Sequence, residues 1–176
     1  GVSFNLRAGE TLGIVGESGC GKSTLARAVL QLIPPTHGAV SWLGSPLNSI
    51  DKQSLKAKRK DLQIVFQDPL ASLDPRMTIS DSIMEPLKTF ARDLSRTEMK
   101  EKVAGMMDRV GLDRNMINRY PHELSGGQNQ RVGIARAMIM RPKLVVCDEA
   151  VSALDVSVQA QIIKLLMDLQ EEFGLS

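Results

Sequence analysis

A glycine-rich stretch near the start of the sequence has the composition and spacing needed to hold phosphate groups. From Gly16 to Ser23 it follows the pattern Gly, four residues, Gly-Lys-Ser. Glycines allow successive backbone amides to curl around one anion, and a helix that begins there adds the positive end of its dipole. Lys22 supplies a mobile charge for the outer phosphates, and Ser23 a hydroxyl for Mg²⁺. An apolar run precedes the stretch and a helical pattern follows it, so we favour a phosphate loop over an ordinary glycine turn.

Two adjacent carboxylates follow an apolar run much later in the chain. Asp148 and Glu149 come directly after residues 144–147, which we interpret as a buried strand. A strand that ends there would deliver both side chains to the sheet edge, where open α/β sheets bind ligands. Asp148 is suited to hold Mg²⁺ through water, and Glu149, expected on the opposite side of the pleat, to polarise an attacking water. Alone, such a pair indicates a solvated turn; the phosphate loop favours the catalytic interpretation.

A second glycine cluster, Ser-Gly-Gly at 125–127, stands before a helix predicted from about Gln128. A helix N-terminus with a serine hydroxyl beside it is suited to an anion. The phosphate loop already serves a nucleotide in the same chain. A spare anion site therefore makes sense if it faces the nucleotide of a second subunit. The residues alone leave a plain helix cap as an equal alternative.

The elements around these motifs alternate in the manner of an α/β fold. Apolar runs predict strands over 11–15, 39–43 and 62–66, and leucine and valine spacing predicts a helix over 23–32. A helical pattern returns over 130–140, ahead of the run that precedes the carboxylates. One face of a last predicted helix comprises Val158, Ile162, Leu165, Leu166, Leu169 and Phe173.

The middle of the chain, residues 67–128, lacks strand signals and is predicted to be helical. Ser95, with Glu98 three residues later, forms the pattern of a capping box, and Gly111 is well placed to end the helix that follows. One face of that helix carries a methionine-rich stripe, which we interpret as core packing rather than a ligand site. The stripe comprises Met99, Val103, Met106, Met107 and Val110.

The composition fits one compact globular domain. The chain has 176 residues, 43% of them hydrophobic and 24% charged. A net charge of +2 does not indicate a polyanionic partner, and no apolar run reaches the roughly 18 residues of a membrane span. The two cysteines, Cys20 and Cys147, show no disulfide framework and indicate a reducing, cytosolic compartment. Because the sequence opens inside a strand-like pattern and stops after a helix, we expect a fragment of a longer domain.

Five segments together resemble the nucleotide-binding domain of ABC ATPases. They occur in that family's order and cover most of the chain. The resemblance implies an α/β fold: a P-loop NTPase (RecA-like) core over 1–66 and 129–176, with an inserted α-helical subdomain over 67–128. The segments are 16–24, similar to Walker A; Gln67 after 64–66, similar to the Q-loop; 124–128, identical to the signature Leu-Ser-Gly-Gly-Gln; 144–149, similar to Walker B; and 152–155, similar to the D-loop.

Three further segments, 66–76, 119–123 and 151–157, resemble the ATPases of importers for oligopeptides, dipeptides and related solutes such as nickel, glutathione and opines. This resemblance implies an ATP-binding and ATP-hydrolysing subunit that powers such an importer. A soluble, non-transport ABC ATPase acting on DNA or ribosomes would share every catalytic motif and is the alternative. Such proteins usually carry two domains in one chain, long insertions or a basic stripe, and none of these is visible here.

The resemblance implies a role for each motif residue, with ATP as the substrate and Mg²⁺ as the cofactor. Glu149 would be the general base, and Gln67 would sense the γ-phosphate. Mg²⁺ would be surrounded by Ser23, Gln67 and Asp148, and Asp155 would touch the partner's phosphate loop. The ATP-binding loop comprises Gly16, Glu17, Ser18, Gly19, Cys20, Gly21, Lys22, Ser23 and Thr24, and the segment that closes over ATP held by the opposite subunit comprises Ser125, Gly126, Gly127 and Gln128.

The resemblance also implies a peripheral position on the cytoplasmic face of the cell (inner) membrane. The partners would be a second ABC ATPase subunit, identical or related, transmembrane permease subunits and, indirectly, an extracytoplasmic solute-binding protein; no nucleic acid is expected. The family's switch histidine and adenine-stacking aromatic residue have no counterpart among the 176 residues. The sequence therefore leaves open whether this stretch alone hydrolyses ATP, and it does not encode the transported solute.

Overall fold

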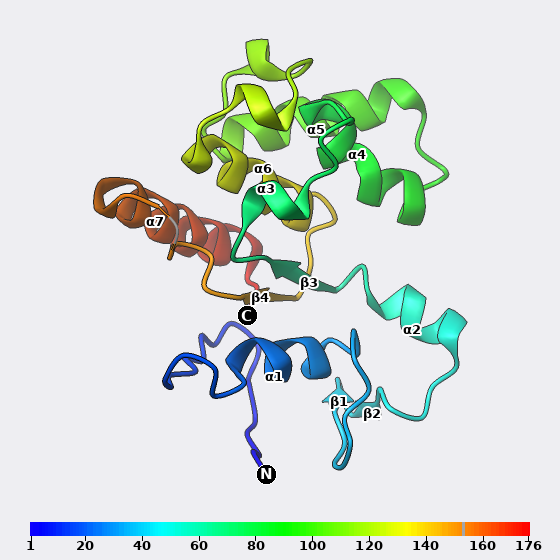
Figure 1. Cartoon of the computed structure of the whole chain (residues 1–176). Coiled ribbons are helices and arrows are strands. Elements are labelled where there is room, and N and C mark those ends of the chain that lie inside the picture. The colour runs from blue at the N-terminus through cyan, green and yellow to red at the C-terminus, as the bar shows by residue number, and fades with distance from the viewer. Residues whose placement is uncertain (153) are drawn as a thin grey trace.

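The computed structural model describes residues 1–152 and 154–176, and its elements follow the order of an α/β fold with a helical middle (Figure 1). The helix predicted over 23–32 and the strands predicted over 62–66 and 144–147 are confirmed to within a few residues. In chain order the elements are α1 (Lys22–Val29), β1 (Ser41–Trp42), β2 (Ser45–Pro46), α2 (Lys52–Lys58), β3 (Leu62–Val65), α3 (Pro69–Ser72), α4 (Ile79–Phe90), α5 (Arg96–Arg109), the 3₁₀ turns Arg114–Met116 and Pro121–Glu123, α6 (Gly126–Met138), β4 (Leu144–Cys147) and α7 (Val156–Phe173).

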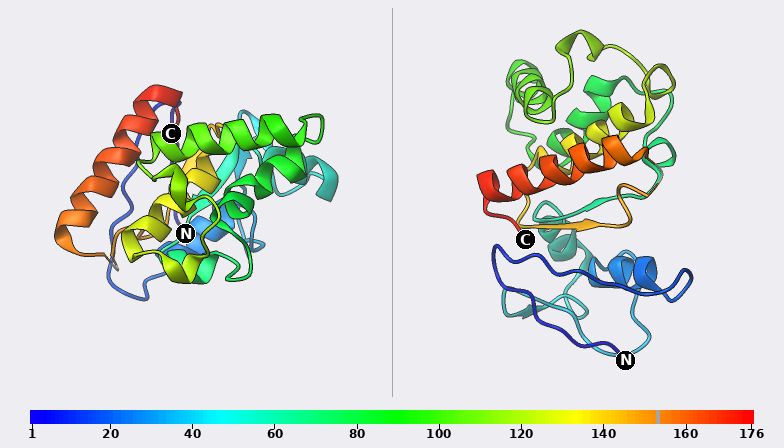
Figure 2. Two further views of the ribbon diagram at one scale, coloured as in Figure 1. Left: turned by 90° about the horizontal axis from the view of Figure 1, so that it is seen from above. Right: turned by 90° about the vertical axis from the view of Figure 1, so that its left-hand side faces the viewer.

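A parallel pair of strands, β3 and β4, lies between two layers of helices. Leu62 pairs with Leu144 and Val65 with Cys147, so both strands end at the same edge of the sheet. Helix α1 lies on one side of the pair, and α6 and α7 lie on the other, with α4 and α5 beyond α6 (Figures 1 and 2). The segments that follow β3 and β4 therefore leave the sheet close together, which brings residue 67 near residues 148 and 149.

The main hydrophobic core joins the helical middle of the chain to α6 and α7. Ile83 on α4, Val103 and Met107 on α5, Ile134 on α6 and Ile162 on α7 are fully buried in it. Burial of such side chains contributes about 1.5–3 kcal/mol each. The methionine stripe of α5 is thus confirmed as core packing. A second, smaller cluster next to α1 comprises Leu30, Leu47, Leu62 and Leu144.

Helix α5 begins and ends as the sequence predicts. The Ser95 hydroxyl accepts a hydrogen bond from the Glu98 amide at 3.3 Å, and the Glu98 carboxylate accepts one from the Ser95 amide at 2.8 Å. These bonds from Ser95 hold the pKa of Glu98 below its ordinary value. At the other end, Gly111 has φ of +68°, in the left-handed region that glycine enters without strain.

Two strand predictions near the N-terminus are wrong. The segment 11–15 has no ladder partner among the described residues, and Val15 is 97% exposed. Leu12 and Ile14 instead line a cavity that β4 also borders, so the segment faces the strand across this space without a ladder to it. Of the run 39–43, only Ser41–Trp42 is a strand, because a turn with φ of +49° at residue 43 and +77° at residue 44 folds the chain back onto β2.

The helical middle is confirmed as strand-free over residues 67–128, all of which the structure describes. Helix α6, which begins at Gly126, nevertheless packs against α3, α4 and α5. The division into a core and a subdomain with a boundary at 128 therefore stays a prediction. Within the described part of the chain, every helix is too short or too polar to cross a membrane.

Candidate functional site

The predicted phosphate loop forms a tight turn that leads directly into α1. Gly19 and Gly21 have φ of +79° and +102°, a region in which other residues are strained. At Gly16, a Cβ atom would lie 2.6 Å from the Cys20 sulfur, so a side chain at this position would require the Cys20 thiol to move. The first amides of a helix have no carbonyl partner within that helix, so the start of α1 can donate to an anion held in the loop.

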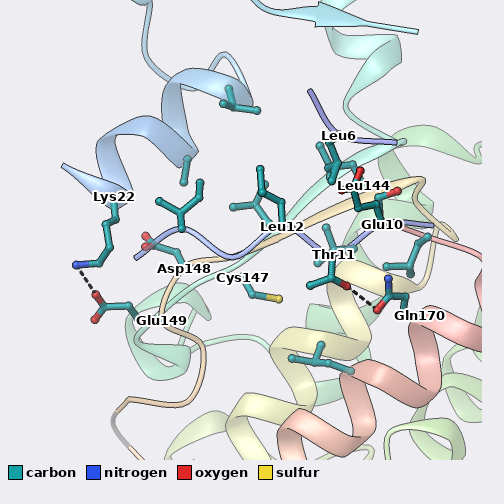
Figure 3. Close-up of a pocket in the computed structure, with 18 of the residues that line it drawn as sticks. Leu6, Glu10, Thr11, Leu12, Lys22, Leu144, Cys147, Asp148, Glu149 and Gln170 are labelled. Carbon is teal, nitrogen blue, oxygen red and sulfur yellow. Dashed lines mark hydrogen bonds and ion pairs between the residues drawn. The ribbon is translucent and has the colours of Figure 1, made fainter. Parts of the chain in front are cut away.

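Lys22, the first residue of α1, places its charge at the mouth of this loop. Its Nζ atom donates to the carbonyl oxygens of Gly16 and Glu17, each at 3.0 Å, and lies 3.5 Å from Glu149 Oε1 (Figure 3). An ammonium group has three donors, and these three acceptors match them. The lysine charge is thus held between the loop and the carboxylate that follows β4.

Ser23 and Asp148 meet across the gap between α1 and the sheet. The Ser23 hydroxyl donates to Asp148 Oδ1 at 2.7 Å, and the Asp148 amide donates to the Val65 carbonyl at 3.0 Å, which fixes the aspartate at the end of the strand pair. A hydroxyl and a carboxylate side by side are oxygen ligands of the kind Mg²⁺ prefers, with water completing its shell. The pair therefore fits the predicted Mg²⁺ role. Among the described residues, no group of three His, Cys, Asp or Glu side chains forms a metal site of its own.

Glu149 is held by both the phosphate loop and the segment after β3. Its Oε2 atom accepts from Gln67 Nε2 at 3.1 Å, and the same amide lies 3.4 Å from the Ser152 hydroxyl. The expectation that Asp148 and Glu149 point to opposite sides of a pleat is wrong. Strand β4 ends at Cys147, and Glu149 has φ of +48°, so the alternation stops and both carboxylates reach α1. A non-glycine residue in this region costs about 1–3 kcal/mol, so the surrounding contacts must hold Glu149 in this conformation.

An apolar cavity of about 430 Å³ lies beside this cluster (Figure 3). Its walls come mainly from residues 4–14, α1, β4 and α7, and the Thr11 hydroxyl donates to Gln170 Oε1 at 2.9 Å along one side. Cys147 borders the cavity, and the protein around the thiol desolvates it and raises its pKa to about 11. The thiol is therefore protonated near neutral pH and contributes no charge to the site.

The second glycine cluster begins α6 and is held by contacts within its own surroundings. The Ser125 hydroxyl accepts from the Gln128 amide at 3.3 Å, and the Gln128 side chain accepts from the Ser125 amide at 2.9 Å. Gly127 packs so closely on α7 that a Cβ atom would lie 2.7 Å from a methyl group of Val158. None of the hydrogen bonds of these residues reaches the phosphate loop within the described chain.

Three expected site segments thus meet within the described chain, together with Ser152 from the start of the predicted D-loop, while the signature segment and Asp155 make no hydrogen bond to them. The structure brings together the phosphate loop, Gln67 and the carboxylates after β4. It also adds Ser152, whose hydroxyl donates to the Glu149 carbonyl at 3.1 Å and which the sequence indicated only as the first residue of the D-loop. Asp155 precedes α7 without capping it through its side chain. Ala153, also in the predicted D-loop, lies outside the described residues.

A phosphate loop whose lysine and serine contact a carboxylate pair at the end of a parallel strand pair is typical of P-loop ATPases, and the signature sequence before α6 indicates the ABC class among them. The chain belongs to the ABC transporter family, whose model matches residues 1–152.

Curated relatives narrow the comparison further. The chain is 61% identical, over 99% of its length, to the oligopeptide transport ATP-binding protein OppF of Haemophilus influenzae, and 60% identical over 100% to OppF of Escherichia coli; it covers 53% of each. The oligopeptide transport ATP-binding protein AppF of Bacillus subtilis is 53% identical over 100% of the chain, which covers 54% of that protein. The chain therefore spans about half the length of the curated relatives it matches.

Solved structures confirm the predicted ABC ATPase fold. The ATP-binding cassette MJ0796, in a dimeric post-hydrolysis state bound to ADP and Pi, matches with a TM-score of 0.86 at 34% identity, over 97% of this chain and 74% of that one. The protein cbiO1 from Clostridium perfringens, part of the ABC transporter complex cbiONQ, matches with a TM-score of 0.86 at 29% identity, over 99% of this chain and 68% of that one.

Proposed function

We propose that this chain binds and hydrolyses Mg-ATP. The observation that carries the proposal is the contact of Lys22 and Gln67 with the two oxygens of one carboxylate, that of Glu149, at 3.5 and 3.1 Å. A lysine for phosphate charge, a candidate base and an amide that can orient water thus converge beside a loop of backbone amides. Positioning and charge stabilisation are the main catalytic requirements of phosphoryl transfer.

Each residue has a defined task in this proposal. Lys22 and the amides of the loop bind the β- and γ-phosphates, and Ser23 and Asp148 hold Mg²⁺, which supplies charge neutralisation on the phosphate oxygens. Glu149 accepts a proton from the attacking water, and Gln67 holds that carboxylate in reach of the γ-phosphate. Asp148 is 7% exposed, so its charge acts with little screening by solvent.

The signature segment serves a second nucleotide in our proposal. Ser125 and Gly127 belong to a helix N-terminus that donates to no group of its own phosphate loop. We infer that this N-terminus closes over ATP held by another ABC ATPase subunit, identical or related, with Gly126, Gln128 and Asp155 at the same junction. Closure adds charge-assisted bonds to the γ-phosphate, so the closed pair is favoured only while that phosphate is present.

We further infer that the whole protein powers import of peptides or related small solutes. The relatives named for oligopeptide transport support this, as does a relative named for glutathione import, GsiA of Pectobacterium atrosepticum, which is 54% identical over 99% of the chain. Its partners would then be permease subunits and, indirectly, a solute-binding protein, and its place the cytoplasmic face of the membrane. Nothing in the described chain favours the rival role on DNA or ribosomes.

Nucleotide binding tests the first part of the proposal. In the full-length protein, Lys22→Ala should weaken Mg-ATP binding at least about tenfold, because the charge aimed at the outer phosphates is lost. Lys164→Ala is the matched control, since Lys164 is an exposed lysine of α7 that forms an ion pair with Asp168. Equal ATP affinity in the two variants, measured by calorimetry, would contradict the assignment.

A transport assay tests the inference that the whole protein powers import. Vesicles that contain the full-length protein with its permease subunits should take up a labelled oligopeptide only with Mg-ATP inside and the solute-binding protein outside. Uptake should disappear with Lys22→Ala. If DNA or ribosomes stimulate ATP hydrolysis and the permease does not, the importer function is rejected in favour of a soluble, non-transport ABC ATPase.

A further inference from the structure

Helix α6 carries two arginines that bind backbone carbonyls of two different helices. Arg131 donates through Nη1 to the Val110 carbonyl at the end of α5, at 2.5 Å. Arg136 donates through Nη1 to the Ser72 carbonyl, the last residue of α3, at 2.7 Å. The chemistry of the two bonds is the same: a guanidinium holds the electronegative end of a neighbouring helix. The two bonds differ in which residues the neighbouring helix positions.

Helix α3 connects the Arg136 contact to Gln67 over one turn. It spans Pro69–Ser72, and Asp68 caps it by accepting from the amides of residues 70 and 71 at 2.9 and 3.0 Å. Gln67 precedes that cap and donates to Glu149. Because the turn is capped at one end and held by Arg136 at the other, a shift of α3 would move Gln67 with it.

The surroundings of Arg136 make its bond strong. The side chain lies at the wall of a hollow of about 460 Å³ between β3, α4 and α6, whose lining also includes Arg59, Phe66 and Glu85. Burial lowers the pKa of the Arg136 guanidinium, and the Glu85 carboxylate opposes that shift. An arginine stays charged even so, and a charged donor in a poorly solvated place binds a carbonyl more strongly than an exposed one does.

We propose that Arg136 is a positioning residue for hydrolysis: it ties α6 to α3 and thereby holds Gln67 against Glu149. Helix α6 has Ser125 at its N-terminus and Arg136 in its last turn. A structural change at the signature segment would therefore be transmitted to Glu149, the proposed base, through α6, Arg136 and α3. This inference rests on the proposed ATP hydrolysis and names a residue that none of the motifs contains.

A double-mutant cycle with Gln67 tests the inference in the full-length protein. Arg136→Gln should lower kcat for ATP about tenfold and change ATP affinity less than about twofold, because the phosphate loop is untouched. In the Gln67→Ala background, Arg136→Gln should change kcat by less than about twofold, since the group it positions is already gone. Arg136→Lys, which keeps the charge but not the reach, should fall between the wild type and Arg136→Gln in kcat.

Arg131→Gln is the control from the same helix, because it removes a carbonyl bond of the same kind, together with the 3.3 Å bond from Arg131 Nη2 to Gln161 Oε1 on α7. It should lower thermal stability at least as much as Arg136→Gln does, while its effect on kcat stays below about twofold in both backgrounds. The inference would be overturned if the kcat losses of Arg136→Gln and Gln67→Ala multiplied in the double mutant, or if Arg131→Gln and Arg136→Gln lowered kcat equally. If Arg136→Gln does not fold, the same cycle with Arg136→Lys provides the test. A wild-type protein without ATP hydrolysis would instead refute the proposed function.

Discussion

The two glycine-rich segments of this chain are built alike locally and differ in what surrounds them. Both precede a helix, α1 in one case and α6 in the other, and both expose that helix's N-terminus. Around the first, Lys22 and Ser23 contact carboxylates that come from the far end of the chain. Around the second, the side chains of Ser125 and Gln128 each accept a hydrogen bond from the other residue's backbone amide. One segment is the centre of a cluster of polar contacts between distant parts of the chain, and the other has the parts of an anion site without side-chain contacts of that kind.

The surroundings of the two segments indicate where the second half of the proposed site would come from. The two segments lie on opposite sides of the β3–β4 pair, since α1 is on one face and α6 on the other (Figures 1 and 2). One phosphate chain cannot contact both from within a single copy. A shared nucleotide, held by the loop of one subunit and the signature of another, uses both segments.

The largest expected effect comes from the candidate base beside the phosphate loop. Glu149→Gln should lower kcat by about 10²–10⁴, the range for removal of a general base, because an amide cannot accept the proton from water. ATP should bind at least as tightly, since a negative charge 3.5 Å from Lys22 Nζ is removed. Single-turnover hydrolysis separates the two effects. Turnover near the wild-type rate would reassign the base.

The signature segment offers a test with an internal control, because two serines cap helices in the same way. Ser125→Ala and Ser95→Ala should each cost about 1 kcal/mol of stability through loss of an N-cap. Only Ser125→Ala should lower ATP turnover, by about tenfold, because only that hydroxyl would face a nucleotide of the second subunit. Thermal unfolding and steady-state hydrolysis measure the two effects. Equal turnover in both variants would leave Ser125 a plain helix cap.

The smallest expected effect concerns the two cysteines near the site. Both thiols are exposed, Cys20 in the phosphate loop and Cys147 at the cavity, but desolvation by the surrounding protein raises the pKa of Cys147 to about 11. Only about one Cys147 thiol in a thousand is ionised at pH 8, and the thiolate is the form that reacts. Iodoacetamide should therefore label Cys20 first, and Mg-ATP should protect it. Labelling of Cys147 should rise about tenfold per pH unit from pH 8 to pH 10; a flat profile would contradict the raised pKa.

Much of the site could be predicted because its physics is local. The spacing from Gly16 to Ser23 encodes a loop and the helix after it, and the apolar run before Asp148 encodes a strand that ends at the right place. The capping box at Ser95 follows from a serine with a glutamate three residues later, and the buried face of α5 follows from helical periodicity. All of these depend on residues within a few turns of one another.

The parts that failed or were missed depend on distant residues. Whether 11–15 pairs with a sheet depends on what lies beside it, and here a cavity separates it from β4. The orientation of Glu149 depends on its left-handed backbone conformation, and no glycine at that position indicates such a conformation in the sequence. In the sequence, Arg136 is an ordinary polar residue of a helix, because its bond to the Ser72 carbonyl joins residues 64 positions apart.

The mass of the full-length Glu149→Gln protein with Mg-ATP tests the shared site most directly. Sedimentation should show a pair of ATPase subunits, formed with itself or with its partner ATPase, when Mg-ATP is present, and single subunits with Mg-ADP. The added change Ser125→Ala should shift the ATP sample back toward single subunits. Single subunits in saturating Mg-ATP, with the partner ATPase and the permease also present, would contradict a nucleotide held between two subunits.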